Sequence, residues 1–319
     1  MIQHAAIPHF YIDDIPIYGD LILAPMEGFS DLPFRLICRE LGSAISYSEF
    51  INALDVIQNS PNIKQKVAFH VEERPIVFQI FDNDPARILD AALRLQDLGP
   101  DIIDINLGCS VRRVAGRGAG AALLREPMKV AKIFQTLSSA LNVPVTAKIR
   151  LGWDEHTCNY LLIARIIQEN GGKLVAVHGR TRKQRYTGVV HREAIAEIKQ
   201  ALSIPVIANG DVRVQRDIEN IKEQTRCDAV MIGRAAIGNP WIFAGMDREQ
   251  VPSELVRETI IRHLNSMLAF YGQEKGLLLF RKHANKYLGL SSLPREKRKA
   301  LLTISQPEEL IQSLNTLIR

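Results

Sequence analysis

Cys109 is the residue whose type and surroundings point most directly to chemistry. It follows the apolar run Ile102–Ile105 and precedes three cations, Arg112, Arg113 and Arg117. We expect these cations to stabilise the Cys109 thiolate and to attract a polyanion. A cysteine in such a loop acts as a nucleophile or as a general acid.

The other three cysteines, Cys38, Cys158 and Cys227, are interpreted as structural. The four cysteines are widely spaced and include no Cys-x-x-Cys pair, which argues against a zinc or iron–sulfur site. We therefore expect no metal centre. Disulfides are not expected either, because a reducing cytosol keeps thiols free.

Polar residues also close most of the other apolar runs. In chain order they are Glu27, Gln79, Asn106, Lys148, Arg150, His178, Arg180, Asn209, Asp211 and Arg234. Lys148 and Gln79 are predicted to face inward. A buried lysine needs an anionic or dipolar partner, because burial without one is costly. The N1–C2 carbonyl edge of a flavin is such a partner, since it gathers negative charge on reduction.

Two glycine-containing motifs indicate a phosphate site. Asn209-Gly210-Asp211 and Gly233-Arg234 combine backbone N–H groups with a cation at the usual phosphate site of barrel enzymes. The segment Gly116–Gly120 is also glycine-rich, but it lacks the GxGxxG spacing and does not directly follow an apolar run. It is therefore a weak dinucleotide motif.

Short apolar runs alternate with amphipathic stretches through most of the chain. The runs predicted as strands are Leu21–Ala24, Ala44–Tyr47, Ile76–Ile80, Ile102–Ile105, Val145–Ile149, Leu174–His178, Val206–Ala208 and Ala229–Ile232. Nearly continuous apolar runs are typical of parallel strands that are covered on both faces. This pattern predicts an α/β fold, a (β/α)₈ TIM barrel with its site at the carboxyl ends of the strands. Residues 10–19 predict a hairpin that plugs the other end.

Helices without strands are predicted after the barrel. Their expected ranges are Ser253–Tyr271, Leu278–Leu288, Pro294–Leu302 and Pro307–Ile318. We divide the chain into a catalytic barrel (residues 1–246) and a small all-α helical bundle (residues 247–319). Residues 252–319 contain 11 basic and 6 acidic residues and so carry the whole net charge of +5. A neutral barrel with a basic helical region suggests two parts that face different partners.

Composition excludes several protein classes. With 46% hydrophobic and 24% charged residues, the chain is globular rather than disordered. No apolar run approaches the roughly 20 residues that span a bilayer, and residues 1–10 lack a signal-peptide pattern. We therefore expect a cytoplasmic protein without a membrane partner, and a monomer.

Seven motifs occur together in an order that is characteristic of one enzyme family. They are Ala24-Pro25-Met26-Glu27-Gly28, Asp104–Cys109, Gly118–Leu124, Lys148–Trp153, His178–Arg182, Asn209-Gly210-Asp211 and Met231–Arg234. Over roughly residues 20–288 the chain resembles the tRNA-dihydrouridine synthases, closest to their bacterial B type. Arg281-Lys282-His283 and Tyr287-Leu288 are similar to the helical domain of these enzymes.

The resemblance implies that FMN and NADPH reduce specific uridines in tRNA to 5,6-dihydrouridine. Cys109 would donate the proton to C5 of the uracil, and reduced FMN the hydride to C6. The residues implied to hold FMN are Pro25, Met26, Glu27, Gln79, Lys148, His178, Asn209, Gly210, Asp211, Gly233 and Arg234. The residues implied to contact the RNA are Asn106, Arg150, Arg180, Arg182 and Arg281.

One position departs from the family pattern. The family usually has proline directly after the active cysteine, whereas this chain has Ser110. Proline would restrict φ, so serine allows a looser loop.

Two other functions fit part of the sequence. An FMN-dependent barrel reductase of a small molecule, such as a dihydroorotate or enoate reductase, would use the same strand-end residues but not the basic regions. A non-catalytic RNA-binding barrel would use the basic regions but has no need of Cys109 and Lys148.

Two basic clusters favour RNA as the partner. The first, after the sixth predicted strand, is Arg180, Arg182, Lys183 and Arg185, next to Tyr186; the second is Arg295, Lys297, Arg298 and Lys299. Because phosphate contacts supply much of the affinity for nucleic acids, binding is predicted to weaken steeply with added salt.

Overall fold

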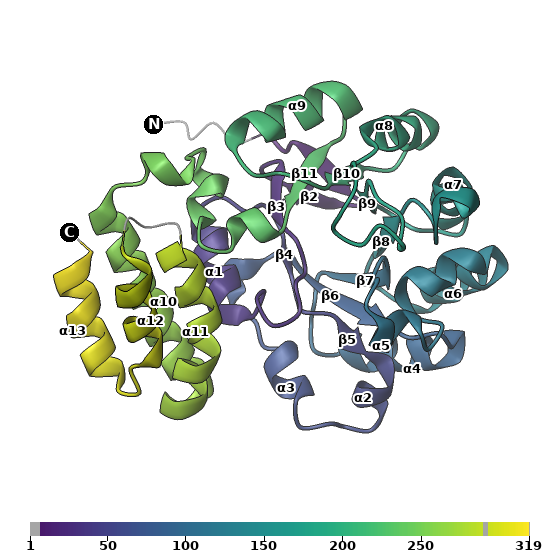
Figure 1. Ribbon diagram of the computed structural model, residues 1–319. Helices are drawn as coiled ribbons and strands as arrows, with labels where there is room; N and C mark the ends of the chain where they lie inside the picture. Colours follow the sequence, from purple (N-terminus) through teal and green to yellow (C-terminus); the bar gives the residue numbers. More distant parts are fainter. Residues whose placement is uncertain (1–6, 290–292, 319) are drawn as a thin grey trace, which may run out of the picture.

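Eight parallel strands form an almost closed barrel that is surrounded by helices (Figure 1). The structure is a computed structural model and describes residues 7–289 and 293–318. In hydrogen-bonded order the strands are β3 (Leu21–Leu23), β11 (Ala229–Ile232), β10 (Val206–Asn209), β9 (Val175–His178), β8 (Val145–Arg150), β7 (Ile102–Leu107), β6 (Ile76–Phe81) and β4 (Ser46–Tyr47). The Ala44 N–H donates to the Leu21 carbonyl at 2.8 Å, where β3 and β4 approach each other. The predicted barrel is confirmed.

The helices predicted between the strands are also present. They are α1 (Leu32–Glu40), α4 (Pro85–Gln96), α6 (Pro127–Ala140), α7 (Tyr160–Glu169), α8 (Arg192–Ala201) and α9 (Gln215–Thr225). Their apolar sides pack on the strands, as shown by Ile88, Leu95 and Phe134, which are fully buried in the main core. Burial of one such side chain stabilises the fold by about 1.5–3 kcal/mol.

Shorter elements were not predicted. They are β5 (Ile51–Asn52), which pairs with β6, the helices α2 (Ala53–Ile57), α3 (Ile63–Lys66) and α5 (Arg112–Ala115), and the 3₁₀ helices η1 (Val71–Glu73), η2 (Gly120–Arg125), η3 (Glu155–Thr157), η4 (Arg234–Ala236), η5 (Pro240–Ala244) and η6 (Arg248–Gln250). Segments of this length are too short for hydrophobic periodicity to reveal.

The predicted hairpin closes the barrel at the amino ends of the strands. Strands β1 (Phe10–Ile12) and β2 (Ile15–Ile17) pair antiparallel, and Asp13 in the turn has a φ of +57°. Ile12 and Ile17 are fully buried in the same apolar cluster as Ile207 of β10. The hairpin therefore excludes water from the interior at the end opposite the predicted site.

In the described part of the C-terminal region, four helices follow the barrel and pack beside α1 (Figure 1). They are α10 (Ser253–Tyr271), α11 (Gln273–Gly289), α12 (Arg295–Thr303) and α13 (Pro307–Leu317). Helix α11 starts at Gln273 rather than at the predicted Leu278. Within the added first turn lies Gly276, where a Cβ would lie 2.6 Å from the Met267 carbonyl oxygen. This glycine permits close packing of α10 against α11 and does not end a helix.

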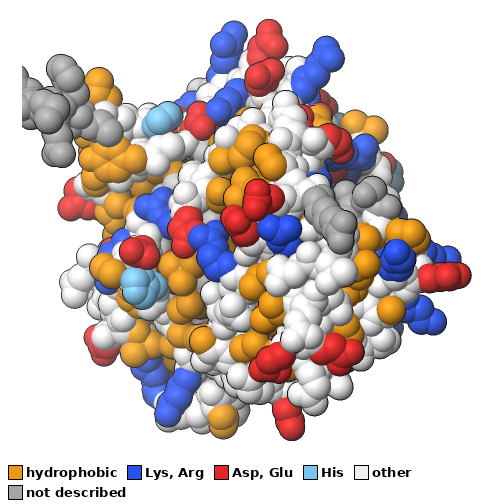
Figure 2. Space-filling view, turned by 90° about the vertical axis from the view of Figure 1, so that its left-hand side faces the viewer, with side chains coloured by type: hydrophobic (Ala, Val, Ile, Leu, Met, Phe, Trp, Pro, Cys, Tyr) orange, Lys and Arg blue, Asp and Glu red, His pale blue; other side chains and the backbone are white. Residues whose placement is uncertain are grey.

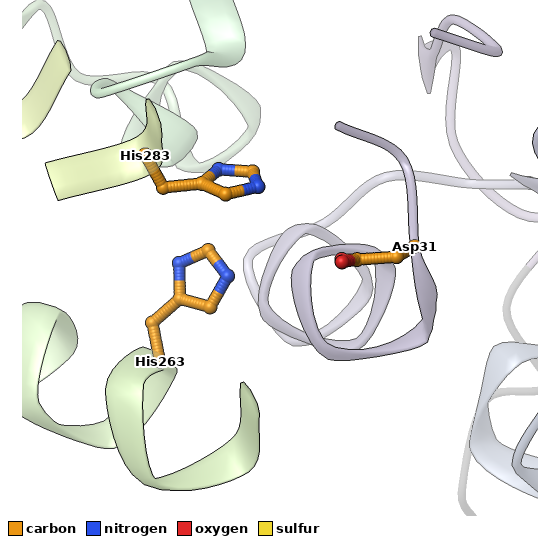
Figure 3. Close-up of side chains that lie close together, drawn as sticks. All are labelled: Asp31, His263 and His283. Carbon is orange, nitrogen blue, oxygen red and sulfur yellow. The ribbon is translucent and has the colours of Figure 1, made fainter. Parts of the chain in front are cut away.

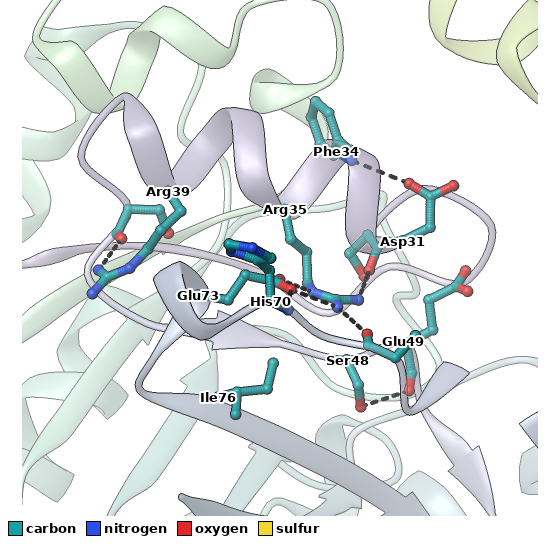
Figure 4. A network of polar contacts seen from close by, with 12 residues as sticks. Asp31, Phe34, Arg35, Arg39, Ser48, Glu49, His70, Glu73 and Ile76 are labelled. Carbon is teal, nitrogen blue, oxygen red and sulfur yellow. Dashed lines mark hydrogen bonds and ion pairs between the residues drawn. The ribbon is translucent and has the colours of Figure 1, made fainter. Parts of the chain in front are cut away.

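A buried ion pair holds the segment that connects β3 to α1 (Figure 4). Arg35 Nε donates to Glu73 Oε1 at 2.6 Å, and both side chains are at most 1% exposed. The Arg35 guanidinium also donates to the carbonyls of Ser30 (3.0 Å) and Ala68 (2.8 Å). Removing one member of such a pair leaves an uncompensated buried charge, at a cost of about 3–5 kcal/mol.

Among the described residues, no helix combines the length and apolarity needed to cross a bilayer. On the face formed by the C-terminal helices, acidic and basic side chains are interspersed with apolar ones (Figure 2). The basic excess of this region therefore does not form one continuous patch on that face.

Candidate active site

A cleft of about 1290 Å³ opens at the carboxyl ends of the barrel strands. All of the predicted site residues line it except Arg182 and Arg281. The lining residues predicted from the sequence are Pro25, Met26, Glu27, Gln79, Asn106, Cys109, Lys148, Arg150, His178, Arg180, Asn209, Gly210, Asp211, Gly233 and Arg234. The parallel strands bring these side chains together because their carboxyl ends all face the same side of the barrel.

The loop after β7 is held in place by a side chain at the end of β7 and another at the end of β8. Asn106 Oδ1 accepts hydrogen bonds from the backbone N–H groups of Cys109 (2.8 Å) and Gly108 (3.1 Å). Arg150, at the end of β8, donates from Nε to the Gly108 carbonyl at 2.8 Å. Cys109 therefore sits in a loop whose backbone is positioned by hydrogen bonds from both sides.

The glycine-rich segment before η2 packs directly against this loop. Gly120 has a φ of +58°, and a Cβ there would lie 3.0 Å from both Cys109 Cβ and the Cys109 carbonyl oxygen. The Ala121 N–H donates to that carbonyl at 3.2 Å. The segment Gly116–Gly120, a weak dinucleotide motif in the sequence, thus supports the Cys109 loop.

A buried carboxylate, that of Asp104, belongs to the same hydrogen-bond network as Asn106. Asp104 is fully buried and accepts hydrogen bonds from Gln79 Nε2 (2.8 Å) and Thr146 Oγ1 (2.6 Å). Gln79 Oε1 in turn accepts from Asn106 Nδ2 at 2.7 Å. Sequence reasoning did not select Asp104, although an aspartate inside an apolar strand was a signal. Burial raises the pKa of Asp104 to about 6.

Lys148 and His178 both lie where burial and neighbouring arginines disfavour a positive charge. Lys148 Nζ donates to Asn209 Oδ1 at 3.0 Å, and Asn209 Nδ2 donates to the Met231 carbonyl at 2.7 Å. Burial, aided by the charge of Arg150, lowers the pKa of Lys148 to about 8. Burial also lowers the pKa of His178 well below its usual value, so this imidazole is neutral at neutral pH.

Burial opposes the effect of the nearby cations on the Cys109 thiol. Burial raises the pKa of the Cys109 thiol, and this effect exceeds the opposing effects of the Val111 N–H and of the charges of Arg150 and Arg113. At neutral pH Cys109 is therefore protonated. A protonated thiol is suited to donating a proton rather than to nucleophilic attack.

Arg180 is hydrogen-bonded to protein groups. It forms a bidentate ion pair with Asp211, in which Nη1 lies 2.8 Å from Oδ1. Its Nε lies 3.1 Å from the carbonyls of Thr187 and Gly188. The side chain is 3% exposed. It therefore holds the segment after β9 against the end of β10.

The two remaining predicted residues lie outside the cleft. The Arg182 guanidinium lies over the Trp153 ring at 4.4 Å, and that of Arg125 lies over the same ring at 5.0 Å. Arg281 Nη2 donates to the Ile304 carbonyl at 3.2 Å, within the C-terminal helices. The structure thus places Arg281 in the packing of the helical region rather than in the cleft.

An exposed tyrosine at the cleft was missed as a site residue. Tyr186 is 56% exposed, and the guanidinium groups of Arg150 (5.6 Å) and Arg234 (5.0 Å) lie over its ring. The sequence noted Tyr186 only as a neighbour of basic residues.

The comparison with protein families agrees with this architecture. The model described as "Dihydrouridine synthase (Dus)" matches residues 22–319. The chain belongs to the dihydrouridine synthase family. The Dus match therefore spans both the barrel and the C-terminal helices.

Curated relatives of this Dus protein cover nearly its whole length. A Pseudomonas aeruginosa protein named tRNA-dihydrouridine synthase B is 42% identical over 286 residues, which make up 87% of this chain and 86% of that protein. A Pasteurella multocida protein of the same name is 36% identical, over 92% of this chain and 91% of that protein.

Solved structures show the same fold at low sequence identity. Histamine dehydrogenase from Rhizobium sp. 4-9 matches with a TM-score of 0.58 and 12% identity, over 81% of this chain and 50% of that chain. The Amycolatopsis orientalis BexX/CysO complex matches with a TM-score of 0.51 and 14% identity, over 82% of this chain and 95% of that chain. At these identities the likeness concerns the fold alone.

Proposed function

We propose that this Dus family protein reduces specific uridines of tRNA to 5,6-dihydrouridine, with FMN as cofactor and NADPH as electron donor. The observation that carries the proposal is the position of Cys109. Asn106 and Arg150 hold the backbone of the loop that carries the Cys109 thiol. The same cleft contains Lys148, a partly buried lysine whose ammonium donates to an amide oxygen, that of Asn209. The relatives named tRNA-dihydrouridine synthase B support the choice of substrate.

The residues of the cleft fit FMN. Among the described residues no carboxylate forms a salt bridge with Lys148, whose ammonium donates to the amide oxygen of Asn209 at 3.0 Å. An anionic ring edge would give this cation its missing partner. Gly210, Gly233 and Arg234 supply backbone N–H groups and a positive charge for the phosphate, and the Arg234 side chain is 60% exposed.

The other predicted cofactor residues surround the same space. We assign Pro25, Met26, Glu27, Gln79, His178, Asn209 and Asp211 to the walls that hold the cofactor. When bound, FMN supplies the hydride that is added to C6 of the uracil.

The protein supplies the proton. The S–H of Cys109 donates its proton to C5 of the uracil, and Arg150 and Arg113 then favour the thiolate that remains. We assign Asn106 and Arg150 to contact with the base, and their position in the lining of the cleft supports this assignment. A proton from solvent restores the thiol for the next cycle.

A uridine reaches this cleft only after it leaves its stack in the RNA. Extrusion costs a few kcal/mol and is easiest in a loop that is already single-stranded. Trp153 and Tyr186, each with arginines over the ring, offer surfaces on which neighbouring bases stack. We assign Arg182 to RNA contact there, while Arg180 positions the loop and Arg281 acts within the helical region.

We assign a different role to each of the two parts of the chain. We propose that residues 1–246 catalyse the reaction and that residues 247–319 help to bind tRNA, in a monomeric cytoplasmic enzyme. Helix α12 carries the second basic cluster, and its residues Arg295, Lys297 and Lys299 are exposed.

The test uses the purified full-length protein, FMN, NADPH and tRNA transcribed without modifications. Dihydrouridine is measured in nuclease digests by mass spectrometry, and its position is mapped in the intact tRNA. We expect product only when all components are present. If the protein binds RNA but binds no flavin and oxidises no NADPH, the result would support a non-catalytic RNA-binding barrel. Reduction of dihydroorotate-type or enoate substrates without any action on tRNA would support a small-molecule reductase.

A further inference from the structure

Three polar side chains meet in the apolar contact between the barrel and the C-terminal helices (Figure 3). Asp31 caps the amino end of α1, His263 lies on α10 and His283 lies on α11. One ligand-type atom from each lies within 4.8 Å of the other two, and all three residues are buried. Figure 3 shows both imidazoles turning a ring nitrogen toward the Asp31 side chain.

Three of the four imidazole nitrogens of this cluster lack a hydrogen-bond partner among the described residues. His263 Nε2 and both ring nitrogens of His283 are buried and bond to no other group in the part of the chain that the structure describes. Both histidines are 0% exposed. A buried polar group without a partner costs about 1–3 kcal/mol, so three in one cluster are a large cost for a merely structural arrangement.

We propose that Asp31, His263 and His283 bind one Zn²⁺ ion, which fastens the helical region to the barrel. Two imidazoles and one carboxylate are common zinc ligands, and a water molecule or the second Asp31 oxygen completes four-fold coordination. The expectation that the protein has no metal centre rested on cysteine spacing. This site has no cysteine, and its ligands are far apart in the sequence.

A hydrogen bond orients the His263 imidazole for metal binding. Tyr287 Oη lies 3.2 Å from His263 Nδ1. When Nδ1–H donates to this oxygen, Nε2 keeps its lone pair for the metal, an arrangement usual for ligating histidines.

Asp31 is oriented in a similar way. The Tyr271 O–H donates to Asp31 Oδ2 at 3.2 Å, and the Phe34 N–H donates to Oδ1 at 3.3 Å. Each oxygen keeps a further lone pair. Bonds to zinc of about 2.0–2.1 Å require ligand atoms roughly 3.3 Å apart in a tetrahedron. The three ligand atoms lie within 4.8 Å of one another, so binding the ion requires them to approach by at most about 1.5 Å.

The site is structural rather than catalytic. The rings of Phe34 and Phe280 pack on His263, and Phe29 packs on His283. None of the three ligand residues lines the cleft. The charge of Lys282, next to His283, opposes a cation, and the Asp31 carboxylate offsets it. The inference is therefore independent of the reaction proposed for Cys109.

The first test measures metal in the full-length protein after passage over a chelating resin. Elemental analysis is expected to find about one zinc per chain in the wild type and at least about tenfold less in His263→Asn and His283→Asn. The matched control is His191→Asn, which changes a partly exposed histidine on α8's amino end and is expected to keep zinc. If the wild type and both cluster variants contain equal amounts of zinc, the proposed site is wrong. If the wild type contains iron that both cluster variants lose, the choice of zinc is wrong.

A second measurement does not depend on variants that fold. Chelator-treated wild-type protein is titrated with Co²⁺, whose tetrahedral complexes absorb at longer wavelengths than flavin, and its melting temperature is recorded with Zn²⁺ or Mg²⁺. We expect saturation at one Co²⁺ per chain and a higher melting temperature with Zn²⁺ only. Neither an absorption band nor a zinc-dependent rise in melting temperature would overturn the proposal.

Discussion

The amide of Asn106 holds the backbone of Cys109: Oδ1 accepts the Cys109 N–H at 2.8 Å. The same amide donates to Gln79, and Gln79 donates to Asp104. A buried carboxylate on β7 thereby sets the orientation of two amides and, through them, the position of the thiol. Cys109 is placed by a chain of hydrogen bonds that starts in the barrel interior.

Replacement of Cys109 tests the proton donor. Cys109→Ser is expected to lower the rate of dihydrouridine formation about 10²–10⁴-fold, because a serine hydroxyl is a far weaker acid. Oxidation of NADPH without RNA is expected to continue, since the hydride chemistry does not use the thiol. Cys158→Ser, at an exposed cysteine outside the cleft, serves as the control. Full activity of Cys109→Ser on unmodified tRNA would disprove the assignment.

Gly120 tests the support of the Cys109 loop. In Gly120→Ala the new Cβ would meet Cys109 at 3.0 Å, so the loop must move and the rate of dihydrouridine formation is expected to fall. Gly245→Ala is a matched control, because Gly245 also has a positive φ (+77°) but has no neighbouring atom within 4 Å. In both variants the alanine at a positive φ costs about 1–2 kcal/mol of backbone strain. Equal activity in the two variants, measured with the same tRNA, would contradict the supporting role.

Asp104 gives a prediction about pH. Its pKa is raised from 3.8 to about 6, so the folded protein binds this proton more tightly than the unfolded chain does. Its contribution to the free energy of unfolding is therefore full below about pH 4 and is lost as the pH rises through about 6. The stability of the wild type relative to Asp104→Asn is expected to fall by about 1 kcal/mol between pH 5 and pH 7. Urea denaturation at both values measures it, and an unchanged difference would refute it.

Arg182 and Trp153 test the RNA surface. Arg182→Gln is expected to weaken tRNA binding and to lower the slope of log K against log salt by about 0.7–0.9, as for one lost phosphate contact. Trp153→Ala is expected to weaken binding with little change in slope, because stacking is not ionic. Arg94→Gln, on α4 and paired with Asp90, is the control. A salt slope identical in wild type and Arg182→Gln would exclude phosphate contact by Arg182.

The sequence by itself determined the barrel and the composition of its cleft. Apolar runs such as Val145–Ile149 identified the strands, and the polar residues that close them, among them Lys148 and Asn209, were found together. This works because parallel strands direct their carboxyl ends to one side, so that local pattern and chain order suffice to gather these residues. The family motifs pointed to the same residues.

Tertiary structure decided what depends on packing between distant segments. The arginines near Cys109 were visible in the sequence, but only the fold shows that burial outweighs their effect and raises the pKa of the thiol. Arg180 proved to be engaged by Asp211, and Arg281 by the Ile304 carbonyl. Asp31, His263 and His283 meet only because α10 and α11 pack on α1. Desolvation and contacts across more than 200 positions leave no local pattern in a sequence, because they arise only when the folded chain excludes water.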